Sequence, residues 1–229
     1  VLASVAPSDK LADLLHQRWL IDSSFAPLAA SILRHLYRID ESNLKLSSFC
    51  LTHLLSDYRA RIAIRSEDSN MFRNNVRALL EMFPVYREID ALISQSLVRP
   101  MFTSLDQLMD QQSDEKDIST VAELLVRHGA VLWKLSKADC DSIIMRIRHA
   151  LCNMDLSAST RRLILQANDL WMNGWNLENI PECILNFYAN NNDELQQTGE
   201  NYERAVTEKS DNGHRNKLSV NQTEAETVI

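Results

Sequence analysis

Very few side chains in this sequence have the spacing that metal binding or catalysis requires. His149 and Cys152 lie three residues apart and could bind one ion from the same face of a helix. Cys140 lies twelve residues before Cys152, about 18 Å along a helix axis, so it cannot complete that site. Packing in the protein core explains His149 and Cys152 better. Because phosphate-loop, nucleophile-elbow and zinc-protease motifs are also missing, we expect no catalytic residue, no metal and no cofactor.

The arginines are distributed less evenly and could bind an anionic partner. Arg59, Arg61 and Arg65 lie near the end of one expected helix, and Arg73 and Arg77 lie near the start of the next. The favourable interaction of cations with a helix C-terminus explains the first three. That explanation fails for Arg73 and Arg77, which lie near an N-terminus. We therefore predict that the five arginines form a basic patch for an acidic protein or for RNA phosphates.

A second group of residues nearer the C-terminus is a weaker candidate for the same kind of contact. These weaker candidates are Arg146, Arg148, Arg161, Arg162 and Trp175. Trp171 and Trp175 flank Gly174, where we expect a helix to end with glycine in the left-handed conformation. Tryptophan often anchors protein partners, but an apolar contact that closes the helix end explains this pair better.

The composition indicates that helices position these side chains. The chain has 229 residues, of which 45% are apolar, but only four are glycine and five are proline. Both residues punctuate sheets and turn-rich folds, so their scarcity favours helices joined by short connections. The net charge of −7 argues against bulk nucleic-acid binding driven by counterion release, while a local basic surface stays compatible with it.

Two further features favour an intracellular protein. No apolar run reaches the ~18 residues that can cross a bilayer, and no signal peptide is visible. The cysteines lack close pairing, so we expect reduced, buried thiols at Cys50, Cys140, Cys152 and Cys183. We therefore expect the protein in the cytoplasm, in the nucleus, or in both.

Apolar residues recur at spacings of three and four over almost the whole sequence before residue 190. Pro84 and Pro100 each open a helix in this interpretation, because proline disfavours helix in the residue before it. The ten expected helices are 8–21, 24–39, 44–65, 70–82, 84–97, 100–111, 118–135, 137–153, 158–173 and 181–188. They form five consecutive pairs of similar length, which predicts an all-α solenoid of HEAT-type antiparallel helix pairs. An irregular all-α bundle is the alternative fold.

The composition changes sharply near residue 190. Residues 190–229 include nine apolar residues, eight acids and four bases. So polar a segment buries too little apolar surface to offset the entropy of ordering it. We therefore predict a helical-repeat domain over residues 1–189 and an acidic, disordered tail or linker over residues 190–229.

Three stretches of the helical region are similar to one known family. Residues 54–61 (LLSDYRAR) are similar to a helix with the pattern L-x-x-x-Y/F followed by charged residues. Residues 97–100 (LVRP) and 124–132 (LLVRHGAVL) are similar to a helix pair that ends in G-x-x-L, and residues 163–175 resemble an A-G-W ending. In this order they resemble the middle domain of translation initiation factor 4G, the MIF4G family. The nearest likeness is to the small stand-alone member that interacts with the stem-loop-binding protein, or to the N-terminal domain of Mextli-type members.

This resemblance implies a non-catalytic scaffold in mRNA translation, acting in initiation or in its regulation. Its helical surfaces would bind translation initiation factors, a DEAD-box RNA helicase or mRNA-binding proteins. RNA would be contacted directly or through such proteins, and no membrane would be involved. Some small members of the family look like dimers, so the resemblance also implies a homodimer as one state.

Other interpretations stay open at this point. The acidic tail differs from the smallest members, which end at the last helix, and is similar to the linker of Mextli-type members. The second functional hypothesis is a HEAT-type protein–protein adaptor in another mRNA process, such as export or decay, or in an unrelated complex. The third is an enzyme whose active-site residues are dispersed along the sequence, for which no motif speaks.

Overall fold

The computed structural model describes residues 8–39 and 44–189, so the predicted tail at 190–229 lies outside the described residues. Within these ranges the chain is all-α, as predicted, and contains no strand. The helices are α1 (Ser8–Ile21), α2 (Phe25–Ile39), α3 (Leu44–Glu67), α4 (Ser69–Ile89), α5 (Ala91–Leu108), α6 (Glu115–Leu135), α7 (Lys137–Asn153), α8 (Ala158–Met172) and the short 3-10 helix η3 (Leu177–Asn179). The chain divides into two compact units, Val1–Leu177 and Glu178–Ile229, and residues 182–189 of the second are helical. None of the described helices combines the length and the apolar character that spanning a membrane requires.

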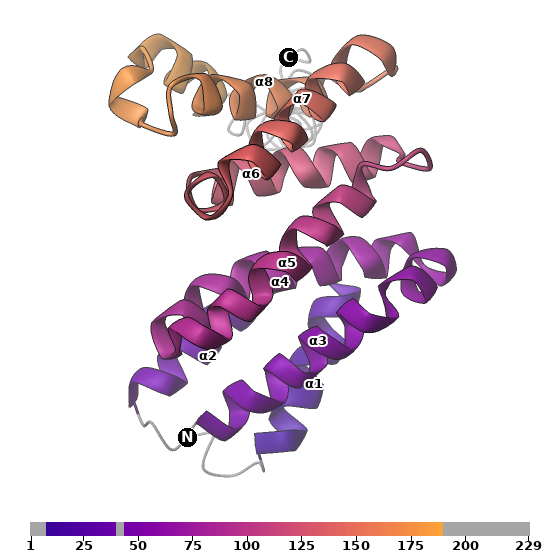
Figure 1. Ribbon diagram of the computed structural model, residues 1–229, viewed down its shortest axis with the longest axis vertical. Coiled ribbons are helices and arrows are strands. Elements are labelled where there is room, and N and C mark those ends of the chain that lie inside the picture. The colour runs from indigo at the N-terminus through magenta and orange to yellow at the C-terminus, as the bar shows by residue number, and fades with distance from the viewer. Residues whose placement is uncertain (1–7, 40–43, 190–229) are drawn as a thin grey trace, which may run out of the picture. The chain divides into compact units, whose positions relative to one another are not determined.

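Helices α1 to α8 stack in the order in which they occur in the chain (Figure 1). Each helix packs against the next one, and contacts between α1 and α3, α2 and α4, α3 and α5, α4 and α6, α5 and α7, and α6 and α8 join successive pairs. All the substantial packing among the described helices joins elements no more than three positions apart. Contacts restricted to near neighbours are typical of helical repeats, so the arrangement is consistent with the predicted α-solenoid.

The predicted count of ten helices in five pairs is wrong, because two prolines lie inside helices. α4 continues through Pro84, and α5 continues through Pro100. A proline within a helix removes one backbone hydrogen bond, at a cost of about 3 kcal/mol. Buried apolar neighbours such as Val85 and Met101 offset this cost by holding both segments in the core.

The chain breaks instead at Asp90, which α4 and α5 share. Its backbone N–H donates to the carbonyl of Tyr86 at 2.8 Å and so ends α4. Its carboxylate accepts from the backbone N–H groups of Leu92 at 2.7 Å and Ile93 at 3.3 Å and so begins α5. This double cap, rather than either proline, decides where the two helices separate.

α4 lies at the centre of the packing. It contacts α1, α2, α3, α5 and α6, and it has buried residues on every side. Its side chains Leu79, Leu80 and Phe83 belong to one continuous core that extends from α1 to α8. The Tyr86 hydroxyl donates to the carbonyl of Ser47 at 2.9 Å, which ties α4 to α3. A helix enclosed in this way must also bury the polar residues that it carries.

All four cysteines are free thiols, but only two are buried. Cys50 in α3 and Cys140 in α7 lie in the core, where burial raises the pKa of each thiol to about 12. Cys152 and Cys183 are exposed. The prediction of buried thiols is therefore wrong for these two, because each lies on an outward face of its helix.

Candidate functional site

Two arginines of the predicted basic patch meet at one carboxylate, which sequence analysis did not single out. Arg73 Nη1 lies 2.7 Å from Asp117 Oδ1, and Arg65 Nη2 lies 3.4 Å from Asp117 Oδ2. Arg65 Nη2 also lies 3.0 Å from Asp110 Oδ1. The side chains of Arg65, Arg73 and Asp117 are 8%, 6% and 5% exposed. Ion pairs inside the protein therefore neutralise the charges of these two arginines.

Arg77 is also engaged by groups of α6. Its Nη2 atom lies 3.1 Å from Glu123 Oε2 and donates to Thr120 Oγ1 at 3.0 Å. Nη1 donates to the side-chain oxygen of Asn74 at 3.3 Å. This explains why arginines occur near the start of α4, where a helix dipole does not favour a cation.

One turn further along, Glu81 of α4 receives the opposite arrangement of charge. Glu81 Oε1 lies 2.7 Å from Arg127 Nη2 and 3.0 Å from His128 Nε2. The spacing of four between Arg73, Arg77 and Glu81 puts them on one face of α4. We call this interface the charged seam; its residues are Arg73, Arg77, Glu81, Asp117, Glu123, Arg127 and His128.

A capping box at the start of α6 positions the acids of the seam. Asp114 accepts from the backbone N–H of Asp117 at 2.8 Å, and the Asp117 side chain accepts from the backbone N–H of Asp114 at 3.3 Å. α6 therefore begins at Glu115, three residues before the predicted start at 118. The pattern D-x-x-D is the signal that would have placed Asp117 inside the helix.

Glu115 extends the polar contacts toward α8. Its Oε1 atom accepts from the backbone N–H of Ser157 at 2.9 Å and from the hydroxyl of Thr160 at 2.8 Å. These hydrogen bonds, those from Ser157 first, hold the pKa of the Glu115 carboxyl below its ordinary value. The same carboxylate thus ties the start of α6 to the first turn of α8.

Two open grooves border the cluster formed by Arg65, Arg73 and Asp117. The α3–α5 groove has a volume of about 760 Å³, and its walls include Arg61, Ile62, Arg65, Thr103, Gln107 and Asp110. A second groove of about 520 Å³ has walls that include Leu20, Ile21, Arg73, Arg77, Lys116 and Thr120. Four of the five predicted arginines are therefore divided between two grooves, Arg61 and Arg65 in the first and Arg73 and Arg77 in the second.

Arg59 and Arg61 differ from the other three. Arg59 is exposed on α3, and no carboxylate of the described residues lies within ion-pair distance of it. The Arg61 guanidinium stacks over the Tyr58 ring, 4.5 Å from its centroid, and donates to the Tyr58 carbonyl at 3.1 Å. Whether these arginines bind a partner stays a prediction, but they are the members of the patch that ion pairs leave free.

The weaker candidate arginines lie on α7 and α8. Arg146 Nη1 lies 2.7 Å from Asp106 Oδ1, and its Nη2 donates to the carbonyl oxygens of Asp106 and Met109. Arg161 pairs with Asp155 at 3.4 Å on the surface, and Arg162 is partly buried on α8.

Arg148 is exposed on α7, with its guanidinium 5.8 Å from the centre of the Trp171 ring. His149 and Cys152 are exposed as well, so the interpretation of these two residues as core residues is wrong. Within residues 8–39 and 44–189, no group of three metal-binding side chains gathers around one point.

Trp175 is used for packing within the helical stack. Gly174 and Trp175 both adopt positive φ, 61° and 60°, and their N–H groups donate to the carbonyls of Trp171 and Leu170 at the end of α8. This conformation brings the indole ring against Gly129 of α6, where an added Cβ would overlap the ring. Trp175 is thus a contact between α6 and the end of α8.

The chain was compared with known proteins. No family model matches it. Over 168 residues it is 23% identical to a protein of Xenopus tropicalis described as a CBP80/20-dependent translation initiation factor. The match covers 73% of this chain and 29% of the length of that protein. The chain, all-helical in its described residues, thus has a distant relative among translation initiation factors and spans less than a third of the length of that relative.

Proposed function

We propose that the chain is a MIF4G-type, non-catalytic adaptor in mRNA translation. The observation that carries this proposal is the similarity to a translation initiation factor, which extends over 73% of the chain. The order of the three MIF4G-like stretches in the sequence supports the same family. The partners we propose are translation initiation factors, a DEAD-box RNA helicase or mRNA-binding proteins.

The physical properties of the stack suit an adaptor. Helices that contact only their near neighbours present a long surface, and the charged seam fixes α4 against α6 within it. A surface that is rigid before binding loses little conformational entropy when a partner binds. The titratable side chains of the charged seam hold one another in ion pairs, which favours a structural role over acid–base chemistry.

Affinity purification of the full chain from cells, with and without nuclease, tests this function. We expect translation initiation factors to be retained, and those bound through protein contacts to survive nuclease treatment. Retention of export or decay factors without any translation factor would contradict the proposal and favour an adaptor of another mRNA process. Cell fractionation in the same experiment tests the expected cytoplasmic or nuclear location.

A further inference from the structure

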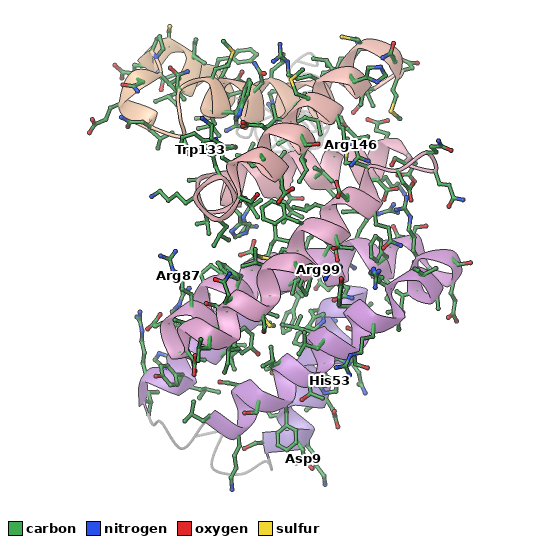
Figure 2. The ribbon with its side chains drawn as sticks, viewed as in Figure 1. Asp9, His53, Arg87, Arg99, Trp133 and Arg146 are labelled. Atoms are coloured by element: carbon green, nitrogen blue, oxygen red, sulfur yellow. The ribbon has the colours of Figure 1, made fainter. Side chains whose placement is uncertain are left out.

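Two arginines outside the charged seam, Arg59 on α3 and Arg99 on α5, lie on the surface that these two helices form. These two helices pack side by side, and Arg59 and Arg99 are exposed on them. Within the described part of the chain, neither has a carboxylate at ion-pair distance. Figure 2 shows Arg99 near the middle of the view, whereas Arg87 of α4 lies to the left of it. Sequence analysis did not single out Arg99.

The register of α3 and α5 brings these side chains to the same end of the α3–α5 groove. Ile62 of α3 and Thr103 of α5 both line the groove. Arg59 precedes Ile62 by one helical turn, and Arg99 precedes Thr103 by one turn. Both arginines therefore border the groove at the end where Arg61 lines it.

The acids of α3 and α5 do not neutralise this end. α3 contains only Asp57 and Glu67, and Asp57 is already bonded to His16 at 2.8 Å, while Glu67 is the last residue of the helix. The single acid of α5, Asp106, pairs with Arg146. The positive charge of Arg59, Arg61 and Arg99 is thus available to a ligand.

The opposite end of the groove carries acids. The side chains of Asp110 and Asp114 are 39% and 55% exposed there. An RNA strand carries a phosphate at every nucleotide and would meet these carboxylates as soon as it extended beyond the arginines, whereas a peptide can confine its acidic residues to the end that contacts the arginines. The apolar residue that the groove exposes is Ile62, which is 68% exposed and lacks the aromatic face on which bases stack. These features favour a short peptide over RNA.

The middle of the groove can bind the backbone of such a peptide. Thr103 and Gln107 line it and supply hydrogen-bond donors and acceptors. Arg65, also part of its wall, has a buried Nη1 group without a partner in the structure. Buried donors are normally satisfied, so this unsatisfied group marks the wall of the groove as unusual.

We propose that the α3–α5 groove binds a short acidic segment of a partner protein. Carboxylates of the segment contact Arg59, Arg61 and Arg99, and an aliphatic side chain covers Ile62. This inference rests on the proposed adaptor function, for which it names a contact site and the chemistry of the partner. The predicted contact residues are now Arg59, Arg61 and Arg99. Arg73 and Arg77 are no longer among them, because ion pairs of the charged seam neutralise their charges.

Fluorescence anisotropy with the full chain tests the proposal. The probe is a fluorescein-labelled dodecapeptide of Glu, Leu and Ser, and its matched controls are the same peptide with Lys in place of Glu and a twelve-nucleotide oligouridylate. We expect the acidic peptide to bind more tightly than both controls. The double substitution Arg59→Glu with Arg99→Glu should weaken its binding about tenfold, because two exposed charge contacts become repulsive. Arg87→Glu, a reversal of an exposed arginine on α4, should leave the affinity unchanged.

Three results would overturn the proposal. One is equal binding of the acidic peptide to the wild type and to the double variant, with circular dichroism confirming that both are folded. Another is tighter binding of the oligouridylate that the double variant loses, which would make the groove an RNA site. The third is a dimer in analytical ultracentrifugation that the double variant disrupts, which would assign the groove to a second copy. If translation factors are still retained in the affinity purification, only the groove assignment fails and the adaptor function stands.

Discussion

The two sides of α4 are packed by different chemistry. α2 packs on one side through the buried residues Ala26, Ala29, Ala30 and Leu33, and among the described residues ion pairs occur only at the exposed edge of this interface, where Arg34 and Arg38 meet Glu88 of α4. α6 packs on the other side through the charged seam, in which Arg73 and Asp117 are as buried as core residues. Both interfaces are formed by the same helix, so they differ in the side chains that they bury and not in the helix that forms them.

This difference indicates a division of tasks. Apolar side chains gain similar burial in several arrangements, so the α2 side supplies driving force without requiring one geometry. A buried ion pair is stabilising only when its partners meet at hydrogen-bond distance, and removing one partner is strongly destabilising. We infer that the apolar side holds the stack together and that the seam fixes the register of α6 on α4.

Charge reversal at the centre of the seam should have the largest effect. Arg73→Glu puts a second carboxylate beside buried Asp117, and we expect it to lower the free energy of unfolding by about 4 kcal/mol or more. Urea denaturation followed by circular dichroism measures this change. Arg59→Glu, at an exposed position, should change it by less than about 0.5 kcal/mol. Equal effects of the two substitutions would contradict the burial of the seam.

Truncating a buried apolar side chain of α2 should have the second largest effect. Leu33 is 1% exposed, and Leu33→Ala should lower the free energy of unfolding by about 3 kcal/mol through lost burial and a cavity. Leu28 on the same helix is 54% exposed, so Leu28→Ala is the matched control and should have little effect. A similar loss for both variants in urea denaturation would mean that α2 does not pack on α4 as described.

A third kind of contact on α6 can be compared with these two. Gly129→Ala should cost about 1–3 kcal/mol, because its Cβ would overlap the Trp175 ring. Gly174→Ala meets no atom within 4 Å but must adopt a φ of 61°, which costs about 1–2 kcal/mol. Thermal unfolding distinguishes the two causes when Trp175→Ala is added. That change should remove the penalty at Gly129 and leave the penalty at Gly174.

The ion pairs of the charged seam should be weaker where their side chains are more exposed. Arg77 and Glu123 are 16% and 37% exposed, so a double-mutant cycle with alanine should give a coupling energy of about 0.5–1 kcal/mol. The same cycle for Arg73 and Asp117 should give a larger value. Equal coupling energies at the two positions would show that burial does not control the strength of the seam.

Glu115 should produce the smallest effect, and one that depends on pH. Because hydrogen bonds lower the pKa of its carboxyl in the folded state, its stabilising contribution is complete above its unfolded pKa. The contribution is lost as the pH falls through the lowered, folded pKa. The melting temperatures of wild type and Glu115→Gln should therefore differ at neutral pH and converge in acid. A constant difference from pH 7 to pH 3 would contradict this role.

The sequence predicts the helical stack well because apolar spacing is a local property. It fails at Pro84 and Pro100, where burial outweighs the rule that helices end before proline. The boundary between α4 and α5 lies at Asp90, and the sequence signal for it is the capping carboxylate of that residue. Prediction from local rules needs both signals to be weighed against packing, which the sequence does not reveal.

The candidate site could be predicted only in part. Clustering of arginines in the sequence indicated the basic patch, but Asp117 lies more than forty residues from Arg73 and Arg65, so their pairing is invisible before the fold is known. Arg99 lies on a different helix from Arg59, and only the packing of α3 on α5 brings both to one groove. Contacts between distant parts of the chain therefore decide which arginines remain free.

Asp90 has a consequence for how this protein can change in evolution. Because a single residue ends α4 and begins α5, the connection has no spare length that could absorb an insertion. One extra residue there would rotate α5 by about 100° about its axis, turning Arg99 and Thr103 away from α3. Homologues that keep the groove should therefore preserve the number of residues between the two helices.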